Sequence, residues 1–227
     1  MTRSRSIAGV SPSLHTRVHL ARHCDVHNPD GVLYGHLPDF PLSTKGIRQA
    51  HALGRRLAQT TARQIFVSPL LRAQQTAEII SGHIPGSTVT TTEDLVEARF
   101  GHYLEGIRPR NVPWRRPLWM VHMVWPGLLP NDERVDEMAA RVERPIRRIL
   151  ATTPDEGGIC VSHGDPIQAF WVRSEHRRAW ALHRLQCAKG GMLELDFADG
   201  TLELITYRPP AKDDAGADPQ SDVGDIA

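Results

Sequence analysis

Short apolar runs that end in polar turns and lead into helical patterns recur along the 227-residue sequence. Strands are expected at 18–21, 64–67 and 158–161, where apolar residues dominate. Strands that alternate with helices typically form a largely parallel sheet with helices on both faces. The sequence therefore predicts an α/β protein: a three-layer sandwich with a mostly parallel sheet and an inserted lid.

Three of the expected helices begin with recognisable capping signals. A helix over about 43–59 starts at a serine or threonine and repeats its apolar residues at helical spacing. Ser68 before Pro69, and Asp165 before Pro166, each place a capping residue ahead of a proline that suits the first helical position. We therefore expect two helices to begin directly where the strands at 64–67 and 158–161 end.

The last part of the chain has the pattern of a sheet edge. A helix over 134–150, interrupted by Pro145, returns the chain to the sheet. Strands at 192–197 and 201–207 then flank Asp199-Gly200, a pair typical of tight hairpin turns. We therefore expect a hairpin or meander near the end of the domain.

Composition divides the chain into one domain and two flanking segments. Residues 1–16 are expected to be flexible, 17–208 to form the domain, and 209–227 to be a disordered acidic tail. Within the domain, 101–132 is rich in tryptophan and proline and breaks the alternating pattern. We expect this insert to be a lid that determines substrate selectivity.

The charge of the chain suits a small anionic substrate. The net charge is +1, but residues 211–227 carry five aspartates against one lysine, a local sum of −4, which leaves about +5 for the rest. This excess is smaller than the clustered basic stripe of a nucleic-acid-binding protein. We therefore expect no nucleic-acid partner.

Cysteine usage and hydropathy indicate the compartment. Cys24, Cys160 and Cys187 are an odd number without paired spacing, which favours a reducing environment over a disulfide framework. The first residues lack the apolar run of a secretion signal, and no segment approaches the roughly 18 apolar residues of a membrane helix. The sequence predicts a cytoplasmic protein without membrane contact, and it leaves a homodimer or another oligomeric state open.

Histidine and arginine side chains lie where the expected strands end. Arg22-His23 closes the first strand, and 68–72 and 162–164 follow the two others. In open α/β sheets, ligands bind beyond the carboxyl ends of the strands, where helix N-termini also favour anions. The three segments therefore predict a phosphate-binding crevice.

Five motifs occur together in one order, although any one alone would be a weak signal. Together they resemble the histidine phosphatase superfamily, which includes the phosphoglycerate mutases, over about 17–207. The motifs are LARHC (20–24), DFPLSTKG (39–46), SPLLRAQQTA (68–77), LVEARFG (95–101, with LEG at 104–106) and VSHG (161–164).

The resemblance implies a phosphohistidine mechanism that needs no metal or other cofactor. His23 would be the nucleophile, and Glu97 would protonate the leaving alkoxide and then activate the hydrolytic water. A neutral imidazole can attack phosphorus only through an unprotonated nitrogen, so we expect an acceptor that determines its tautomer. The side chains expected to hold the phosphate of the small substrate are Arg22, Arg72, His163, which also counts as catalytic, and Asn28.

Two departures from the family pattern affect the functional prediction. Cys24 stands where the family usually has glycine, and we expect its side chain to crowd the phosphate. The residues after Glu97 lack the mutase signature, so a phosphatase fits better than a mutase. The leading prediction is a metal-independent phosphomonoesterase. A mutase and a non-catalytic phosphate-binding protein of the same fold are the alternatives, and Arg115-Arg116 could bind a substrate carboxylate or a second phosphate.

Other side chains compete for two of these roles. Asp25 is the chief rival of Glu97 as general acid, and Glu93 and Glu105 are also near in sequence. A separate cluster invites a metal-site interpretation. We disfavour it because two of its members project to opposite faces of a strand and no second ligand pair follows. Its members are His19, His23, Cys24 and His27.

Overall fold

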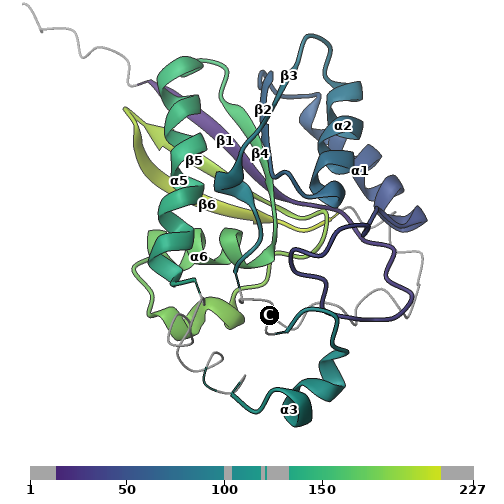
Figure 1. Cartoon of the computed structure of the whole chain (residues 1–227). Helices are drawn as coiled ribbons and strands as arrows, with labels where there is room; N and C mark the ends of the chain where they lie inside the picture. The colour runs from purple at the N-terminus through teal and green to yellow at the C-terminus, as the bar shows by residue number, and fades with distance from the viewer. Residues whose placement is uncertain (1–13, 100–103, 119–120, 122–132, 211–227) are drawn as a thin grey trace, which may run out of the picture.

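A six-stranded sheet forms the centre of the protein (Figure 1). The computed structural model describes residues 14–99, 104–118, 121 and 133–210. The strands are β1 (His15–Arg22), β2 (Gln64–Val67), β3 (Thr88–Thr91), β4 (Gly158–Ser162), β5 (Met192–Ala198) and β6 (Thr201–Arg208). Their order is β3-β2-β4-β1-β5-β6; the first four strands in this order are mutually parallel, β5 is antiparallel to β1, and β6 is antiparallel to β5. The mostly parallel sheet predicted from the sequence is confirmed.

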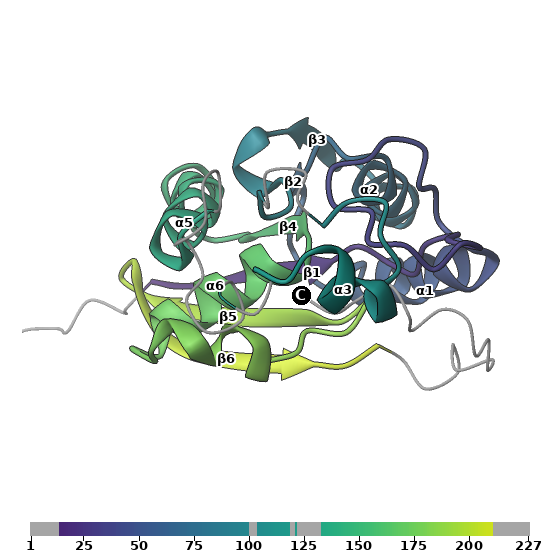
Figure 2. The same cartoon turned by 60° about the horizontal axis from the view of Figure 1, so that its bottom comes forward.

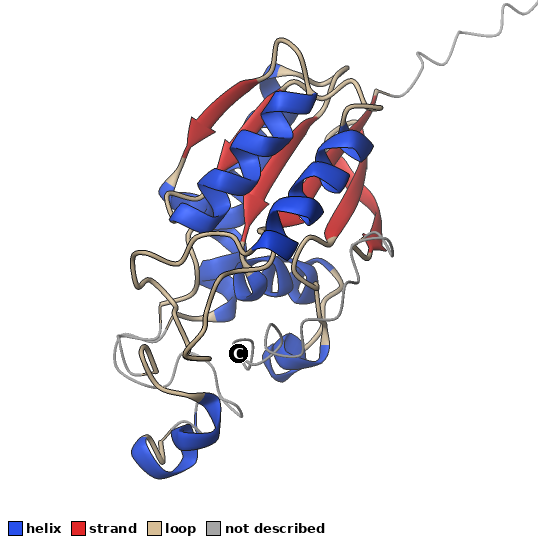
Figure 3. Ribbon diagram, turned by 90° about the vertical axis from the view of Figure 1, so that its right-hand side faces the viewer, coloured by secondary structure: helices blue, strands red, loops and turns tan. Residues whose placement is uncertain are grey.

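Helices cover both faces of the sheet. The helices are α1 (Thr44–Leu57), α2 (Leu71–His83), the short α3 (Val112–Arg115), α5 (Val135–Thr152) and α6 (Gly164–Ser174), with 3-10 turns at Glu93–Leu95, Pro109–Asn111 and Ala179–Arg184. Figure 3 shows α1 and α2 lying across one face, and Figure 2 shows α5 and α6 on the opposite side of the sheet from α1 and α2. The three-layer sandwich is therefore confirmed.

The central strand β1 contributes to the cores on both faces because its side chains alternate. Val18 and Leu20 are fully buried in the cluster that includes residues of α5 and α6. Ala21 belongs to the cluster on the α1 and α2 side. The strand begins at His15, three residues before the expected start, so His15 and Thr16 belong to the sheet rather than to a flexible segment. Residues 1–13 lie outside the described part.

Two helices begin at other residues than the capping signals predict. α1 begins as expected: the Ser43 side chain accepts a hydrogen bond from the backbone N–H of Gly46 at 3.0 Å. α2, however, begins at Leu71, because the Ser68 hydroxyl contacts His163 instead of capping a helix. His163 occupies the N-cap position of α6 without a capping hydrogen bond from its side chain, so Asp165 is the second residue of the helix. His163 is involved in both differences: it contacts Ser68 before α2, and it directly precedes the first residue of α6.

The hairpin and the insert differ in how far the sequence predicted them. Asp199 and Gly200 both have positive φ (47° and 76°), and they join β5 to β6 as the sequence predicts. β3 was not predicted, because its side chains are all exposed and carry no buried pattern. Half of the insert, including Trp119 and Trp125, lies outside the described residues, as do residues 211–227 of the tail, so the lid stays a prediction.

A membrane-crossing helix would need a longer apolar stretch than any helix in the described segments possesses.

His19 is expected to make folding sensitive to acid. It is 3 % exposed on β1, and burial, followed by smaller opposing effects of Glu194 and the nearby arginines, lowers its pKa from 6.5 to about 4. The unfolded chain therefore binds a proton between these pH values that the folded chain does not, and stability is lost as the pH falls through this window. We expect this site alone to lower the free energy of unfolding by about 2 kcal/mol between pH 7 and pH 5.

Urea unfolding at several pH values checks this expectation. His19→Gln should show a correspondingly shallower loss of stability than the wild type between pH 7 and pH 5, and the eleven remaining histidines serve as a common background. Parallel pH curves for the two proteins would contradict the assignment to His19.

Candidate active site

Three segments that are distant in sequence meet at the carboxyl ends of the parallel strands. The backbone N–H of His23 donates to the Ser162 carbonyl at 2.9 Å, and the N–H of Ser68 donates to the Val161 carbonyl at 3.1 Å. These bonds extend the sheet pairing by one residue beyond β1 and β2. The rings of His23 and His163 consequently lie 5.0 Å apart, centre to centre. The three segments predicted to meet at the strand ends are therefore neighbours in the structure, and the phosphate-binding crevice stays a prediction.

His23 is held in one tautomer. Its ring is fully buried, and Nδ1 lies 2.8 Å from the carbonyl oxygen of Cys24. A carbonyl oxygen can only accept, so Nδ1 carries the proton and Nε2 keeps its lone pair. Burial, and then the charges of Arg72 and Arg22, hold the pKa of His23 well below its usual 6.5. The acceptor expected from the sequence is thus present, and Nε2 is a neutral nucleophile.

Arg72 adjoins this lone pair. Its side chain is 1 % exposed, and Nε donates to His23 Nε2 at 3.3 Å. Nη2 donates to the Gly35 carbonyl at 2.8 Å, and the guanidinium carbon stacks 4.7 Å from the centre of the Tyr34 ring. The loop before α1 therefore orients a planar cation at the atom that would attack phosphorus.

Arg22 supplies a second buried cation. Its Nη1 donates to the carbonyl of Cys187 at 2.8 Å. The guanidinium lies against the backbone of Gly164, where a Cβ atom would come within 3.1 Å of Cζ and Nη2. Gly164 is therefore needed so that the N-terminus of α6 and Arg22 can approach each other.

Adding a methyl group at Gly164 is expected to impair the site more than the fold. Gly164→Ala should lower kcat/KM about tenfold, because Arg22 must shift by a few tenths of an ångström from its place beside the bound phosphate. Gly82→Ala in α2 is the matched control, since a Cβ there meets nothing within 4 Å. Steady-state kinetics and thermal unfolding of both variants check this expectation, and equal kinetics in the two would contradict it.

His163 is oriented by a serine, and a carboxylate lies near its other ring nitrogen. Its Nε2 lies 2.7 Å from Ser68 Oγ, and its Nδ1 lies 3.8 Å from Oε2 of Glu97. Burial, and then the charge of Arg72, hold the pKa of His163 well below 6.5. The ring is therefore neutral near pH 7, and its contact with Glu97 is not an ion pair.

The structure separates the two candidate general acids. Glu97 is mostly buried (side chain 12 % exposed) and faces His163; its Oε1 accepts from the N–H of Ala98 at 2.9 Å. Asp25 instead accepts from the Ser43 hydroxyl at 2.6 Å and pairs with Lys189 at 3.4 Å, which stabilises the start of α1. The geometry favours Glu97 as the acid.

The remaining rivals and Asn28 lie elsewhere. Glu93 is exposed, and Glu105 accepts from the backbone N–H of His36 at 2.6 Å. The Asn28 amide donates to the Val32 carbonyl at 2.8 Å and accepts from the Val32 N–H at 3.2 Å, within its own loop. Its contribution to phosphate binding stays a prediction, and it would require these bonds to rearrange.

The side chain of Cys24 lies in a small apolar cluster. Its side chain is fully buried and packs against Leu42 and Ala50. Its backbone N–H donates to the Thr76 hydroxyl at 3.1 Å, and its carbonyl orients His23. Leu42 and Ala50 thus accommodate a residue larger than glycine, and the effect of Cys24 on activity stays a prediction.

Several contacts of the site were missed from the sequence. The hydroxyl of Ser68 was assigned to a helix cap, and no local pattern marks the carbonyls of Gly35 and Cys187 as partners of the arginines.

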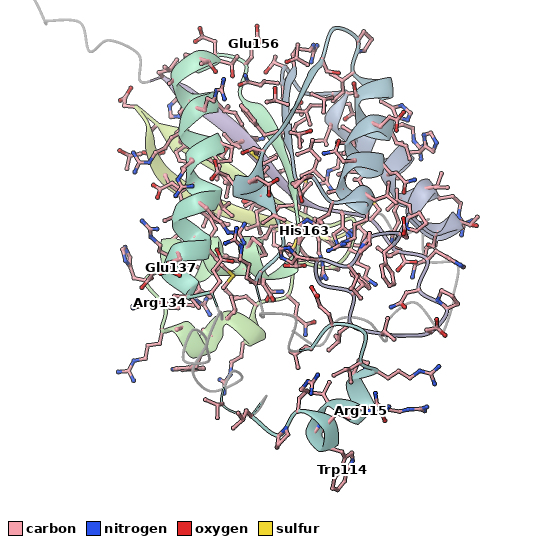
Figure 4. All side chains as sticks on the ribbon, viewed as in Figure 1. Trp114, Arg115, Arg134, Glu137, Glu156 and His163 are labelled. Atoms are coloured by element: carbon pink, nitrogen blue, oxygen red, sulfur yellow. The ribbon has the colours of Figure 1, made fainter. Side chains whose placement is uncertain are left out.

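Arg115 and Trp114 lie well away from His163 in Figure 4, at the outer end of the insert. Within the described segments, no three His, Cys, Asp or Glu side chains are grouped to hold a metal ion.

Comparison with known proteins identifies the family. The model of the histidine phosphatase superfamily (branch 1) matches residues 18–208. The chain therefore belongs to the histidine phosphatase superfamily, and its central sheet with flanking helices is the fold of that family.

Individual relatives cover most of the chain. The uncharacterized protein Rv0525 of Mycobacterium tuberculosis is 33 % identical over 199 residues, covering 86 % of this chain and 97 % of that protein. A Salmonella choleraesuis protein named Probable phosphoglycerate mutase GpmB is 27 % identical over 188 residues, covering 81 % of this chain and 86 % of that protein. The crystal structure of the alpha-ribazole phosphatase from Shigella flexneri is 26 % identical, with a TM-score of 0.69, covering 86 % and 96 % of the two chains. Similar proteins thus include phosphatases and mutase-like proteins.

Proposed function

We propose that the protein is a metal-independent phosphatase that hydrolyses a small phosphomonoester through a phosphohistidine on His23. One observation carries this proposal: the buried Nε2 of His23 is kept unprotonated by the Cys24 carbonyl and adjoins the guanidinium of Arg72. A nucleophile of this kind is the part of the mechanism that a non-catalytic phosphate-binding protein would not need.

The described side chains account for each step of the reaction. The lone pair of His23 Nε2 forms a bond to phosphorus as the bond from phosphorus to the ester oxygen breaks, and Glu97 gives its proton to the departing alkoxide. A water molecule then attacks phosphorus, Glu97 takes a proton from it, and the P–N electron pair returns to Nε2. Arg22 and Arg72 neutralise the nonbridging oxygens throughout, so the charge is balanced without a metal ion.

A phosphoglycerate mutase-like phosphoryl transferase is the second candidate. The similarity to the Salmonella protein favours it, because both activities use a phosphorylated histidine. The residues after Glu97 favour hydrolysis, since the mutase signature is missing there. A mutase would be stimulated by a bisphosphoglycerate primer and would place the phosphoryl group on a second hydroxyl instead of releasing it.

Turnover of p-nitrophenyl phosphate in excess EDTA tests the proposal. We expect steady release of inorganic phosphate, together with a labelled protein that is stable in alkali and labile in acid, as phosphohistidine is. Phosphate affinity without turnover would indicate a binding protein. Activity that EDTA abolishes and a divalent ion restores would overturn the metal-independent mechanism.

A further inference from the structure

Arg141 lies on α5 and directs its guanidinium toward the segment that carries Glu97. The side chain is 10 % exposed, and its hydrogen bonds use all five N–H donors of the guanidinium. Nε and one Nη2 donor reach the Glu133 carboxylate at 2.6 and 3.0 Å. The other three donors reach the backbone carbonyls of Asp94 at 3.0 Å, Val96 at 2.5 Å and Glu97 at 3.3 Å.

Glu133 connects this arginine to the two ends of the insert. Its backbone N–H donates to the Arg99 carbonyl at 3.1 Å, and its Oε2 accepts from the Arg99 N–H at 3.4 Å. Arg99 is the last described residue before the insert, and Glu133 follows its last undescribed stretch. Arg99 and Glu133 together form the root of the insert. Arg141 joins this root to Glu97, which lies two positions before Arg99.

A second donor holds the same carbonyl from another element. Nε2 of His36, in the loop before α1, lies 2.9 Å from the Glu97 carbonyl and 3.1 Å from that of Ala98. The backbone of Glu97 is thus held by α5 and by this loop, and only its side chain can turn. That side chain then reaches His163, 3.8 Å from Oε2 to Nδ1.

Stability alone does not explain this arrangement. Removing two charges from water costs several kcal/mol, so a buried ion pair often stabilises a fold no better than an apolar pair would. The planar fork of arginine can satisfy three carbonyls and a carboxylate together, which the single ammonium of lysine cannot. The benefit of Arg141 therefore lies in the geometry it imposes on Glu97.

We propose that Arg141 is a positioning residue for the general acid, and that Glu133 couples the acid to the root of the insert. The inference rests on the proposed function, in which Glu97 protonates the leaving group. Arg141 fixes the backbone from which the carboxyl group extends, so its loss misplaces the proton donor while His23, Arg22 and Arg72 stay in place.

Two substrates that differ in leaving group test this role. An alkoxide needs a proton as it departs, whereas p-nitrophenolate is a stable anion that leaves without one. In single-turnover phosphorylation of His23, Arg141→Lys and Arg141→Met should react about tenfold more slowly with a simple alkyl phosphate and nearly normally with p-nitrophenyl phosphate. Glu97→Gln should show the same selectivity with a larger effect.

Arg144→Met is the matched control. Arg144 lies on the same helix and donates to the Asp94 side chain, but it is 67 % exposed, and this bond goes to a carboxylate rather than to the backbone. It should leave both phosphorylation rates unchanged. Equal slowing of both substrates by the Arg141 variants, or no slowing, would overturn the positioning role.

Amide hydrogen exchange gives a readout that does not depend on activity. The N–H group of Arg99 should exchange faster in Arg141→Met than in Arg144→Met, because its acceptor, the Glu133 carboxylate, loses the guanidinium that holds it. If the wild type forms no phosphoenzyme, the proposed function fails by itself. Unchanged exchange in Arg141→Met would then overturn the coupling of Arg141 to the insert.

Discussion

His23→Ala is expected to lower kcat/KM by at least about three orders of magnitude and to abolish the acid-labile phosphoenzyme. The reason is the placement of the nucleophile. The lone pair on Nε2 of His23 adjoins Arg72, whereas Nε2 of His163 is hydrogen-bonded to Ser68. A neighbouring imidazole therefore cannot replace the missing one. Stopped assays with p-nitrophenyl phosphate in EDTA, with the label followed after alkaline quenching, measure both effects.

A surface histidine provides the control for this substitution. His51 lies exposed on α1, where its Nδ1 is 3.0 Å from Nε2 of His83, so His51→Ala should retain wild-type turnover. Because His23 is fully buried, His23→Gln, which fills more of the space, is made alongside the alanine variant. A folded His23 variant that turns over at the wild-type rate would end the phosphohistidine mechanism.

Arg72→Lys is expected to lower kcat/KM by about a hundredfold or more, although the charge is kept. Lysine cannot reproduce the two directed bonds of Arg72, from Nε to His23 and from Nη2 to Gly35, or the stacking on Tyr34. Arg48→Lys, at an exposed position on α1, is the control and should be neutral. Comparable activity of the two variants would show that Arg72 acts only as a point charge or not at all.

Arg72→Ala adds a measurement that a purely structural role would not affect. The charge of Arg72 is the second cause, after burial, of the low pKa of His23. Removing that charge should raise the pKa of His23 toward 6.5, so that the nucleophile becomes protonated, and inactive, at a higher pH than in the wild type. Titration of the His23 ring by NMR checks the direction, and an unchanged pKa would contradict it.

Local pattern was sufficient for the elements that carry their own signal. Continuous apolar runs located β2 and β4, helical spacing located α1 and α5, and Asp199-Gly200 located the hairpin, because each depends on residues within a few positions of one another. The starts of α2 and α6 were misplaced. The hydroxyl of Ser68 could cap a helix or bind a distant imidazole, and only the packed sheet, which brings His163 within 2.7 Å, decides between these partners.

The candidate site divides in the same way. The candidate residues could be named because each stands in a motif that resembles the family. They are Arg22, His23, Arg72, Glu97 and His163. Other features could not be predicted, because each depends on which backbone carbonyls and side chains surround a group after folding. They are the packing of Cys24, the different partners of Glu97 and Asp25, and the use of all five N–H donors of Arg141. The sequence thus indicated the candidate reacting groups of this protein. The tertiary structure decided their hydrogen-bond partners, the tautomer of His23 and the lowered pKa of both histidines, since burial and hydrogen bonding arise only when distant segments pack together.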